Sequence, residues 1–126
     1  MIEPKTVLVV DDDVHIRRII DITFTRSGYR VLTASNGAEA LGLIYSMKPD
    51  AVITDLNMPE FSGEALCRKT NPMKKERNFL TIVMTARINP EEQEWLAEMD
   101  NTRYFEKPFS PTRLLACVDE YFQNAN

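Results

Sequence analysis

Short apolar runs, each followed by polar residues, recur along the chain and predict buried strands. The clearest are residues 6–10 and 80–84, which are continuous and rich in β-branched side chains, and the shorter run 51–53 follows the same pattern. A continuous apolar run indicates a strand covered on both faces, as in a parallel sheet. Residues 29–34 and 103–106 read as two further strands. We therefore expect five strands, of which the three apolar ones are buried.

Between and after these runs, apolar residues recur at helical spacing. The first predicted helix carries Ile16, Ile19, Ile20 and Phe24 at that spacing and stops at Gly28. The residues expected to cap or open the helices are Asp13, Asn36, Ser62, Asn89 and Ser110. Five strands that alternate with five helices, and that need cover on both faces, predict a doubly wound parallel α/β sheet.

Two further segments are expected to lie at the surface. Residues 73–78 read as a polar loop, and the basic side chains in and near it are expected to be solvated. These basic side chains are Arg68, Lys69, Lys74, Lys75 and Arg77. Trp95 lies on an otherwise polar helix, which slightly favours an exposed anchor for a partner over a core position.

Length, charge and cysteine usage narrow the class of protein. The 126 residues fit one domain, residues 1–126, without a linker or repeat. With 15 basic and 19 acidic residues the net charge is -4, which argues against nucleic-acid binding by this chain. No apolar run approaches the roughly 20 residues that cross a membrane. Cys67 and Cys117 have no metal-binding spacing, so we expect buried thiols in a reducing cytoplasm.

Polar side chains with complementary charges follow four of the predicted strands. Asp11 and Asp12 follow the first, Asp55 ends the third, Thr85 ends the fourth and Lys107 follows the fifth. Taken alone, Asp55 could equally well begin a turn. In a parallel sheet, however, all carboxyl ends lie on one edge, so these five side chains should converge there.

The chemistry of this set indicates a phosphoryl-transfer site. Carboxylates packed together repel one another unless a cation compensates, and an all-oxygen ligand set favours Mg²⁺. We expect Asp11, Asp12 and Asp55 to hold this Mg²⁺, with the backbone carbonyl of Asn57 as a further ligand. The Lys107 ammonium could pair with a phosphoryl oxygen, and the Thr85 hydroxyl could donate to another. Asp55, which stands apart from the paired acids, is then the best candidate for a carboxylate nucleophile.

At these positions the chain resembles the receiver domains of bacterial two-component response regulators, typified by the chemotaxis receiver. The matching residues are Asp11-Asp12 after VLVV, Asp55-Leu56-Asn57-Met58-Pro59 with Gly63 following, Thr85-Ala86 after IVM, and Lys107-Pro108-Phe109 within EKPF. The resemblance covers essentially the whole chain and implies a flavodoxin-like (βα)5 fold with strand order 2-1-3-4-5. It implies that a histidine kinase or phosphotransfer protein donates a phosphoryl group to Asp55, in a Mg²⁺-dependent reaction in the cytoplasm.

The resemblance carries further expectations. Thr85 and Lys107 would bind phosphoryl oxygens, and the Lys107-Pro108 peptide would be cis. Tyr104 matches the aromatic switch position, whose ring moves inward behind Thr85 and remodels the fourth helix, fifth strand and fifth helix for an unknown output partner. The protein would be a monomer or a phosphorylation-dependent dimer. It would be no enzyme beyond its own phosphorylation and dephosphorylation. Residues 99–102 depart from the usual Gly-Ala, so the shape of that loop is open.

Two alternatives belong to other functional classes. A haloacid-dehalogenase-like phosphotransferase would use Asp11 within Asp11-Asp12-Asp13 as its nucleophile, but His15 replaces the usual Thr or Val and the chain has no room for a cap domain. A receiver-like binding module that is never phosphorylated would not need the five site residues, all of which are present.

Overall fold

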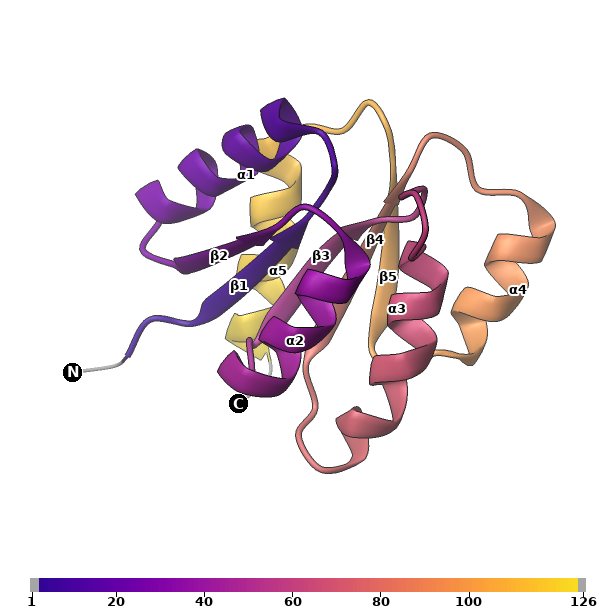
Figure 1. Cartoon of the computed structure of the whole chain (residues 1–126). Coiled ribbons are helices and arrows are strands. Elements are labelled where there is room, and N and C mark those ends of the chain that lie inside the picture. The colour runs from indigo at the N-terminus through magenta and orange to yellow at the C-terminus, as the bar shows by residue number, and fades with distance from the viewer. Residues whose placement is uncertain (1–2, 125–126) are drawn as a thin grey trace.

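In the computed structural model, which describes residues 3–124, five parallel strands form one sheet with helices on both faces (Figure 1). The strands are β1 (Thr6–Val10), β2 (Arg30–Ala34), β3 (Ala51–Asp55), β4 (Leu80–Thr85) and β5 (Thr102–Glu106). Their order is β2-β1-β3-β4-β5, as the resemblance implied. The three central strands are buried over almost all their residues, whereas the two edge strands are partly exposed, in keeping with their weaker apolar patterns.

The helices occupy the predicted segments and begin at the predicted caps. They are α1 (Val14–Arg26), α2 (Gly37–Met47), α3 (Gly63–Thr70), α4 (Pro90–Glu98) and α5 (Pro111–Asn124). Each capping oxygen accepts an N–H of the following turn. For example, Asp13 Oδ1 accepts from the His15 N–H at 2.8 Å, and Asn89 Oδ1 accepts from the Glu92 N–H at 2.8 Å. These bonds satisfy N–H groups that have no partner within the helix.

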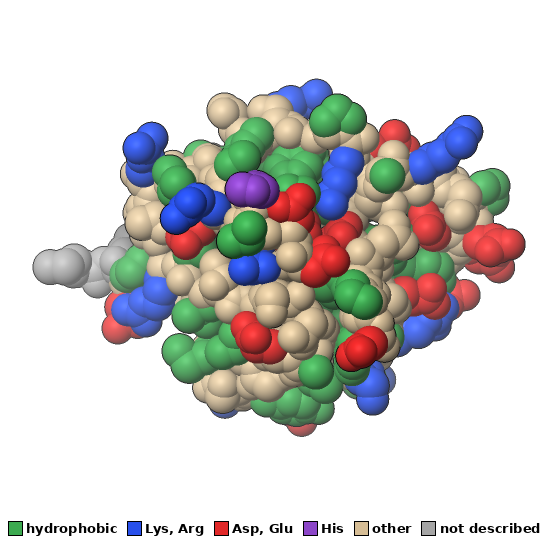
Figure 2. Space-filling view, turned by 45° about the horizontal axis from the view of Figure 1, so that its top comes forward, with side chains coloured by type: hydrophobic (Ala, Val, Ile, Leu, Met, Phe, Trp, Pro, Cys, Tyr) green, Lys and Arg blue, Asp and Glu red, His purple; other side chains and the backbone are tan. Residues whose placement is uncertain are grey.

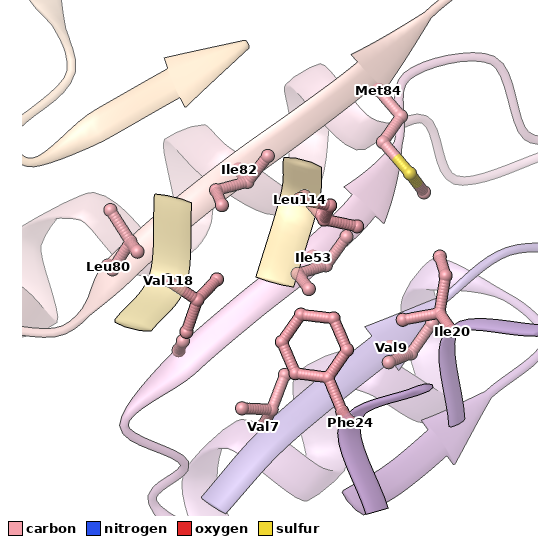
Figure 3. Packing of buried hydrophobic residues seen from close by; sticks show 11 residues of the cluster. Val7, Val9, Ile20, Phe24, Ile53, Leu80, Ile82, Met84, Leu114 and Val118 are labelled. Atoms are coloured by element: carbon pink, nitrogen blue, oxygen red, sulfur yellow. The ribbon is translucent and has the colours of Figure 1, made fainter. Parts of the chain in front are cut away.

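The core on one face of the sheet lies under α1 and α5 (Figure 3). In this cluster Ile20 and Phe24 of α1 and Leu114 and Val118 of α5 pack against the inward residues of the central strands. Ile19, which shares the helical spacing, is 49% exposed. It lies one position, or about 100°, from Ile20, so it falls outside the stripe that faces the sheet.

The opposite face carries α2, α3 and α4, and here the expectation for Trp95 was wrong. Trp95 is only 6% exposed and belongs to a cluster with Leu56, Cys67, Val83 and Leu96. The helix α4 presents few apolar residues, and Trp95 and Leu96 are the ones that bury it against α3 and β4. The polar residues next to Trp95 in the sequence therefore lie on the outer face of α4, and Trp95 itself faces inward.

Lys74 contradicts the expectation of a solvated loop over residues 73–78, because a 3₁₀ helix, η1 (Asn71–Lys75), forms at its start and buries this side chain. The other basic side chains agree with that expectation better, since Arg68, Lys69 and Lys75 are exposed and Arg77 is half-buried. The Lys74 Nζ donates to the carbonyl oxygens of Asp100 and Asn101 at 2.5 and 3.2 Å, and to Thr102 Oγ1 at 3.2 Å. We call this arrangement the Lys74 anchor. It ties η1 to the loop before β5, at the amino end of the sheet.

The loop at residues 99–102 takes its shape from the same contacts. Asn101 adopts a left-handed conformation, with φ of 48°, and its carbonyl accepts from the Thr81 N–H at 3.0 Å. The Asp100 N–H donates to Asn71 Oδ1 at 2.8 Å. Asparagine tolerates the left-handed region better than most residues, so the Gly-Ala pair of the usual pattern is not required for this turn.

The structure also bears on the expectations about membrane spans and about the two cysteines. Within residues 3–124, no helix combines the length and apolar character that a membrane span requires. Cys67 is a buried free thiol, as expected, whereas the free thiol of Cys117 is only half-buried.

Candidate functional site

The sheet ladder continues one residue past the strands and fixes the candidate residues at the carboxyl edge. Asp11 follows β1, and its N–H donates to the Ala34 carbonyl at 3.2 Å. At the other side of the edge, the Lys107 N–H donates to the Thr85 carbonyl at 2.7 Å. Asp55 and Thr85 are the last residues of β3 and β4. The four strand ends that were expected to converge therefore do so.

Three carboxylates form the centre of the site. One carboxylate oxygen from each of Asp11, Asp12 and Asp55 lies within 4.8 Å of the other two. Asp11 is fully buried and Asp55 is 6% exposed, whereas Asp12 is open to solvent. Figure 2, which brings the upper edge of Figure 1 forward, shows acidic side chains gathered in the middle of this face with basic side chains beside them. The cluster is thus buried on one side and accessible on the other.

Lys107 reaches two of these acids. Its Nζ lies 3.2 Å from Asp55 Oδ1 and 3.6 Å from Asp11 Oδ2. The Lys107-Pro108 peptide is cis, as the resemblance implied. One ammonium cannot neutralise three carboxylates, so the site as built keeps an excess of negative charge.

Asp11 shows the electrostatic cost of this arrangement. Burial is the main reason that the pKa of its carboxyl is raised, and the nearby Asp55 and Asp12 charges raise it further. The Asp13 N–H, which donates to Asp11 Oδ1 at 2.9 Å, and the Lys107 ammonium oppose this rise in pKa. Asp11 Oδ2 is buried and has no hydrogen-bond partner among the described residues. Apart from the Lys107 ammonium at 3.6 Å, this oxygen has only carboxylates beside it, and such a set of oxygen ligands fits a hard divalent cation.

Thr85 ends β4 and Tyr104 lies in β5, as expected, and their response to a phosphoryl group stays a prediction. The Thr85 hydroxyl donates to the Arg87 carbonyl at 3.2 Å and accepts from the Arg87 N–H at 3.4 Å. Tyr104 is 45% exposed and lines a hollow of about 520 Å³ with residues of β5 and α5. The Tyr104 ring therefore has room to take a second position, which is what a switch needs, whereas Thr85 is buried.

The turn after Asp55 brings α3 close to the site. The Gly63 N–H donates to the Leu56 carbonyl at 2.9 Å, and the Phe61 N–H donates to the Pro59 carbonyl at 2.7 Å. The Asn57 side chain is exposed, and the role of its backbone carbonyl as a metal ligand stays a prediction.

Sequence reasoning missed one residue at the site. Arg17, in the first turns of α1, donates from Nη1 to the Asp11 carbonyl oxygen at 2.7 Å. The only hint in the sequence was that a basic residue lies six positions after Asp11, on the helix that follows the acids. Many helices carry such a residue without contacting a site.

Comparison with known proteins identifies relatives over nearly the whole chain. The family model of the response regulator receiver domain matches residues 7–119. The chain is 35% identical over 122 residues to the probable transcriptional regulator ycf27 of Guillardia theta, an alignment that covers 97% of this chain and 47% of that protein. It is 34% identical over 114 residues to the alkaline phosphatase synthesis transcriptional regulatory protein PhoP of Bacillus subtilis, covering 90% of this chain and 44% of that protein.

Solved structures show the same architecture. The chemotaxis protein CheY4 of Vibrio cholerae superposes with a TM-score of 0.84 at 29% identity, covering 93% of this chain and 98% of that chain. The response regulator DrrB of Thermotoga maritima gives 0.83 at 27% identity, covering 98% of this chain and 54% of that chain. The chain therefore has about the length of the chemotaxis protein and spans about half the length of the curated relatives it matches.

Proposed function

Because the chain belongs to the response regulator receiver domains of two-component systems, we propose that Asp55 accepts a phosphoryl group and so controls a signalling output. The observation that carries this proposal is the position of Asp55, whose Oδ1 lies 3.2 Å from Lys107 Nζ within the three-acid cluster. Receiver domains are signalling domains, and we expect this one to catalyse only its own phosphorylation and dephosphorylation.

The residues around Asp55 support an in-line transfer. An Asp55 carboxylate oxygen attacks the phosphorus of a phosphohistidine on a histidine kinase or phosphotransfer protein. The P–O bond forms, the P–N bond breaks, and the histidine nitrogen keeps the electron pair of the broken bond. Lys107, already 3.2 Å from Asp55, pairs with a phosphoryl oxygen. Water later attacks the phosphorus of the acyl phosphate, which breaks the bond to the Asp55 oxygen, releases inorganic phosphate and restores the carboxylate.

Mg²⁺ fits the acids that surround this reaction. Asp11, Asp12, Asp55 and the backbone carbonyl of Asn57 would hold it, and it would neutralise charge that develops on the phosphoryl oxygens. Asp11 Oδ2 supports this assignment, because it is buried and accepts no hydrogen bond from the described residues.

Thr85 and Tyr104 are proposed to report the phosphoryl group. The Thr85 hydroxyl would leave Arg87 and donate to a phosphoryl oxygen, and the half-exposed Tyr104 ring would follow it inward. The surface of α4, β5 and α5 would then change for an output partner or domain. Tyr104→Ala should therefore leave phosphorylation intact and weaken partner output; loss of phosphorylation in this variant would contradict the switch role.

The phosphodonor is proposed to approach beside α1. Val14 and Ile19 of this helix are 55% and 49% exposed, and Ile19 lines an apolar hollow of about 460 Å³ with Lys107 and Phe109.

We propose that residues 1–126 form a single receiver domain that works in the cytoplasm. This domain would be a monomer or a phosphorylation-dependent dimer. With a net charge of -4 it is not expected to bind nucleic acid itself.

Acetyl phosphate and Mg²⁺ provide the direct test. Intact-mass spectrometry should show one phosphoryl adduct on the wild type and none on Asp55→Asn. Asp50→Asn is a matched control, because Asp50 lies at the other end of β3 and accepts from the Thr6 N–H. No adduct on the wild type, or an adduct that persists in Asp55→Asn, would refute the proposal. Turnover of small phosphate esters that is lost in Asp11→Asn would instead favour the haloacid-dehalogenase-like enzyme.

A further inference from the structure

Arg17 holds the peptide unit that joins the two acids at the end of β1. Its Nη1 donates to the Asp11 carbonyl oxygen at 2.7 Å. The backbone of Arg17 is itself fixed in the first turns of α1, where its N–H donates to the Asp13 carbonyl at 3.1 Å. The contact therefore runs from a rigid helix to the carbonyl between Asp11 and Asp12.

The position of Asp12 depends on this peptide. The peptide unit is planar from one α-carbon to the next, so fixing the Asp11 carbonyl also fixes the Asp12 α-carbon, from which the side chain projects. The Asp12 side chain is exposed. Asp11, in contrast, is buried and is held by the Asp13 N–H and by Lys107. Of the two paired acids, Asp12 thus relies more on the main chain for its orientation.

We propose that Arg17 is a positioning residue, which fixes the Asp11–Asp12 peptide so that both carboxylates serve one cation. This inference rests on the proposed Mg²⁺ site and adds a residue that touches neither the cation nor the phosphoryl group. Arginine suits the role because its guanidinium stays charged and its planar donors hold a defined direction.

The sign of the effect separates positioning from simple charge. Removing a positive side chain beside three carboxylates should, by Coulomb's law alone, strengthen the binding of a divalent cation. Loss of a group that orients a metal ligand should weaken it, by about 10-fold or more. A weaker affinity in Arg17→Met is therefore an outcome that charge does not explain.

The test is isothermal titration of Mg²⁺ into chelator-treated protein that carries no phosphoryl group. Arg17→Met should bind Mg²⁺ about 10-fold more weakly than the wild type. Arg17→Lys, which keeps the charge and one donor group, should fall between them. Arg18→Met is the matched control, because it removes the same charge from the next, exposed position of α1 and should bind as the wild type does.

A purely structural role would show in a different measurement. It would lower the melting temperature of Arg17→Met in chelator while leaving the Mg²⁺ affinity of the folded protein unchanged, and this result would overturn the proposal. Wild-type or tighter binding by Arg17→Met would do the same. If Arg17→Met does not fold, Arg17→Lys decides, since wild-type affinity in that variant also overturns the inference.

Asp12→Asn distinguishes this failure from a failure of the proposed function. If Asp12→Asn loses Mg²⁺ binding while Arg17→Met keeps it, the acid site stands and only the role of Arg17 is wrong. If the wild type does not bind Mg²⁺, or if Asp12→Asn binds it equally well, the metal site and the role of Arg17 fall together.

Discussion

A β-carbon on Gly63 would lie 2.4 Å from the Asp55 carbonyl oxygen and 2.8 Å from the Leu56 α-carbon. Both atoms belong to the backbone, so neither can turn aside as a side chain would. Gly63→Ala should therefore push α3 away from the end of β3 and lower the free energy of unfolding by about 1–3 kcal/mol. Urea denaturation followed by the fluorescence of the single tryptophan, Trp95, measures this loss. Phosphorylation of Asp55 by acetyl phosphate should slow in the same variant.

Gly42→Ala is the control for this substitution. Gly42 lies inside α2, and a β-carbon added there would meet no neighbouring element within 4 Å. Alanine there should raise the free energy of unfolding by about 0.5–1 kcal/mol, because glycine loses more conformational freedom in a helix. If the two variants changed stability in the same direction, close approach to Asp55 would not be the reason for Gly63.

Trp95→Ala should be one of the most destabilising substitutions in the chain. The side chain is 6% exposed and lies with Leu56, Cys67, Val83 and Leu96. Removing a buried tryptophan costs about 3–5 kcal/mol through lost contacts and the cavity left behind. Far-ultraviolet circular dichroism in urea measures it without the fluorophore, and Trp95→Phe should lose less. A loss below about 1 kcal/mol would mean that Trp95 is a surface residue after all.

Asp11→Asn should stabilise the metal-free protein near neutral pH. The pKa of Asp11 is raised above its ordinary value of 3.8, mainly by burial, so ionising this group costs more in the folded than in the unfolded chain. The cost is absent below pH 3.8, grows as pH rises through the window up to the raised folded pKa, and is constant above it. The stability gain of Asp11→Asn in chelator should follow that course.

Adding Mg²⁺ should reduce or reverse the stability gain of Asp11→Asn over the wild type. A ligand that binds only the folded state stabilises that state, and the wild type keeps the Asp11 carboxylate that we expect to bind Mg²⁺. Glu94→Gln, at an exposed position of α4, is the control and should show neither the gain nor the Mg²⁺ effect. Urea titrations at several pH values, with and without Mg²⁺, measure both. If Asp11→Asn were less stable than the wild type in chelator, the ionised Asp11 carboxylate would not destabilise the metal-free folded state.

Lys74 should make stability rise with pH in the alkaline range. Burial lowers the pKa of this side chain from 10.5 to about 8, against the opposing influence of Cys67 and Asp100. Between these two values the folded chain has lost a proton that the unfolded chain still binds, so raising the pH favours folding. Below about pH 8 and above 10.5 this contribution should be flat.

The measurement is the difference in free energy of unfolding between the wild type and Lys74→Met at pH values from below to above this window. As pH rises through the window, the free energy of unfolding of the wild type should increase relative to that of Lys74→Met. The contributions of the other titrating groups are the same in both proteins and cancel in the difference. Lys75→Met, at the exposed neighbouring position, should show no such slope. The reverse slope would mean that burial does not control the Lys74 ammonium.

The strands and the convergence of the site residues could be read from the sequence because each has a local cause, whereas the strand order came from the family resemblance. Continuous apolar runs need cover on both faces, and parallel strands deliver their last residues to one edge. The acids at 11, 12 and 55 and the lysine at 107 were found in this way. The sequence could not show that Asp12 is exposed while Asp11 is buried, since both follow the same strand.

The residues whose surroundings were predicted wrongly, or missed, owe these surroundings to contacts with residues far away in the sequence. The burial of Lys74 relies on acceptors 26 to 28 positions away, and lysine is otherwise among the most exposed residue types. Trp95 is buried by Leu56, Cys67 and Val83, while its own helix gives a polar pattern. Arg17 was missed because a helical arginine becomes notable only once the carbonyl that it contacts is known.

The Lys74 anchor lies at the amino end of the parallel sheet, and the acid cluster lies at its carboxyl end. Strands β4 and β5 have six and five residues, which separates the two regions by roughly 17–20 Å. Free-energy effects of substitutions that far apart usually add. Substitutions at the Lys74 anchor should therefore change the stability of the fold without changing the phosphorylation chemistry proposed for the acid cluster.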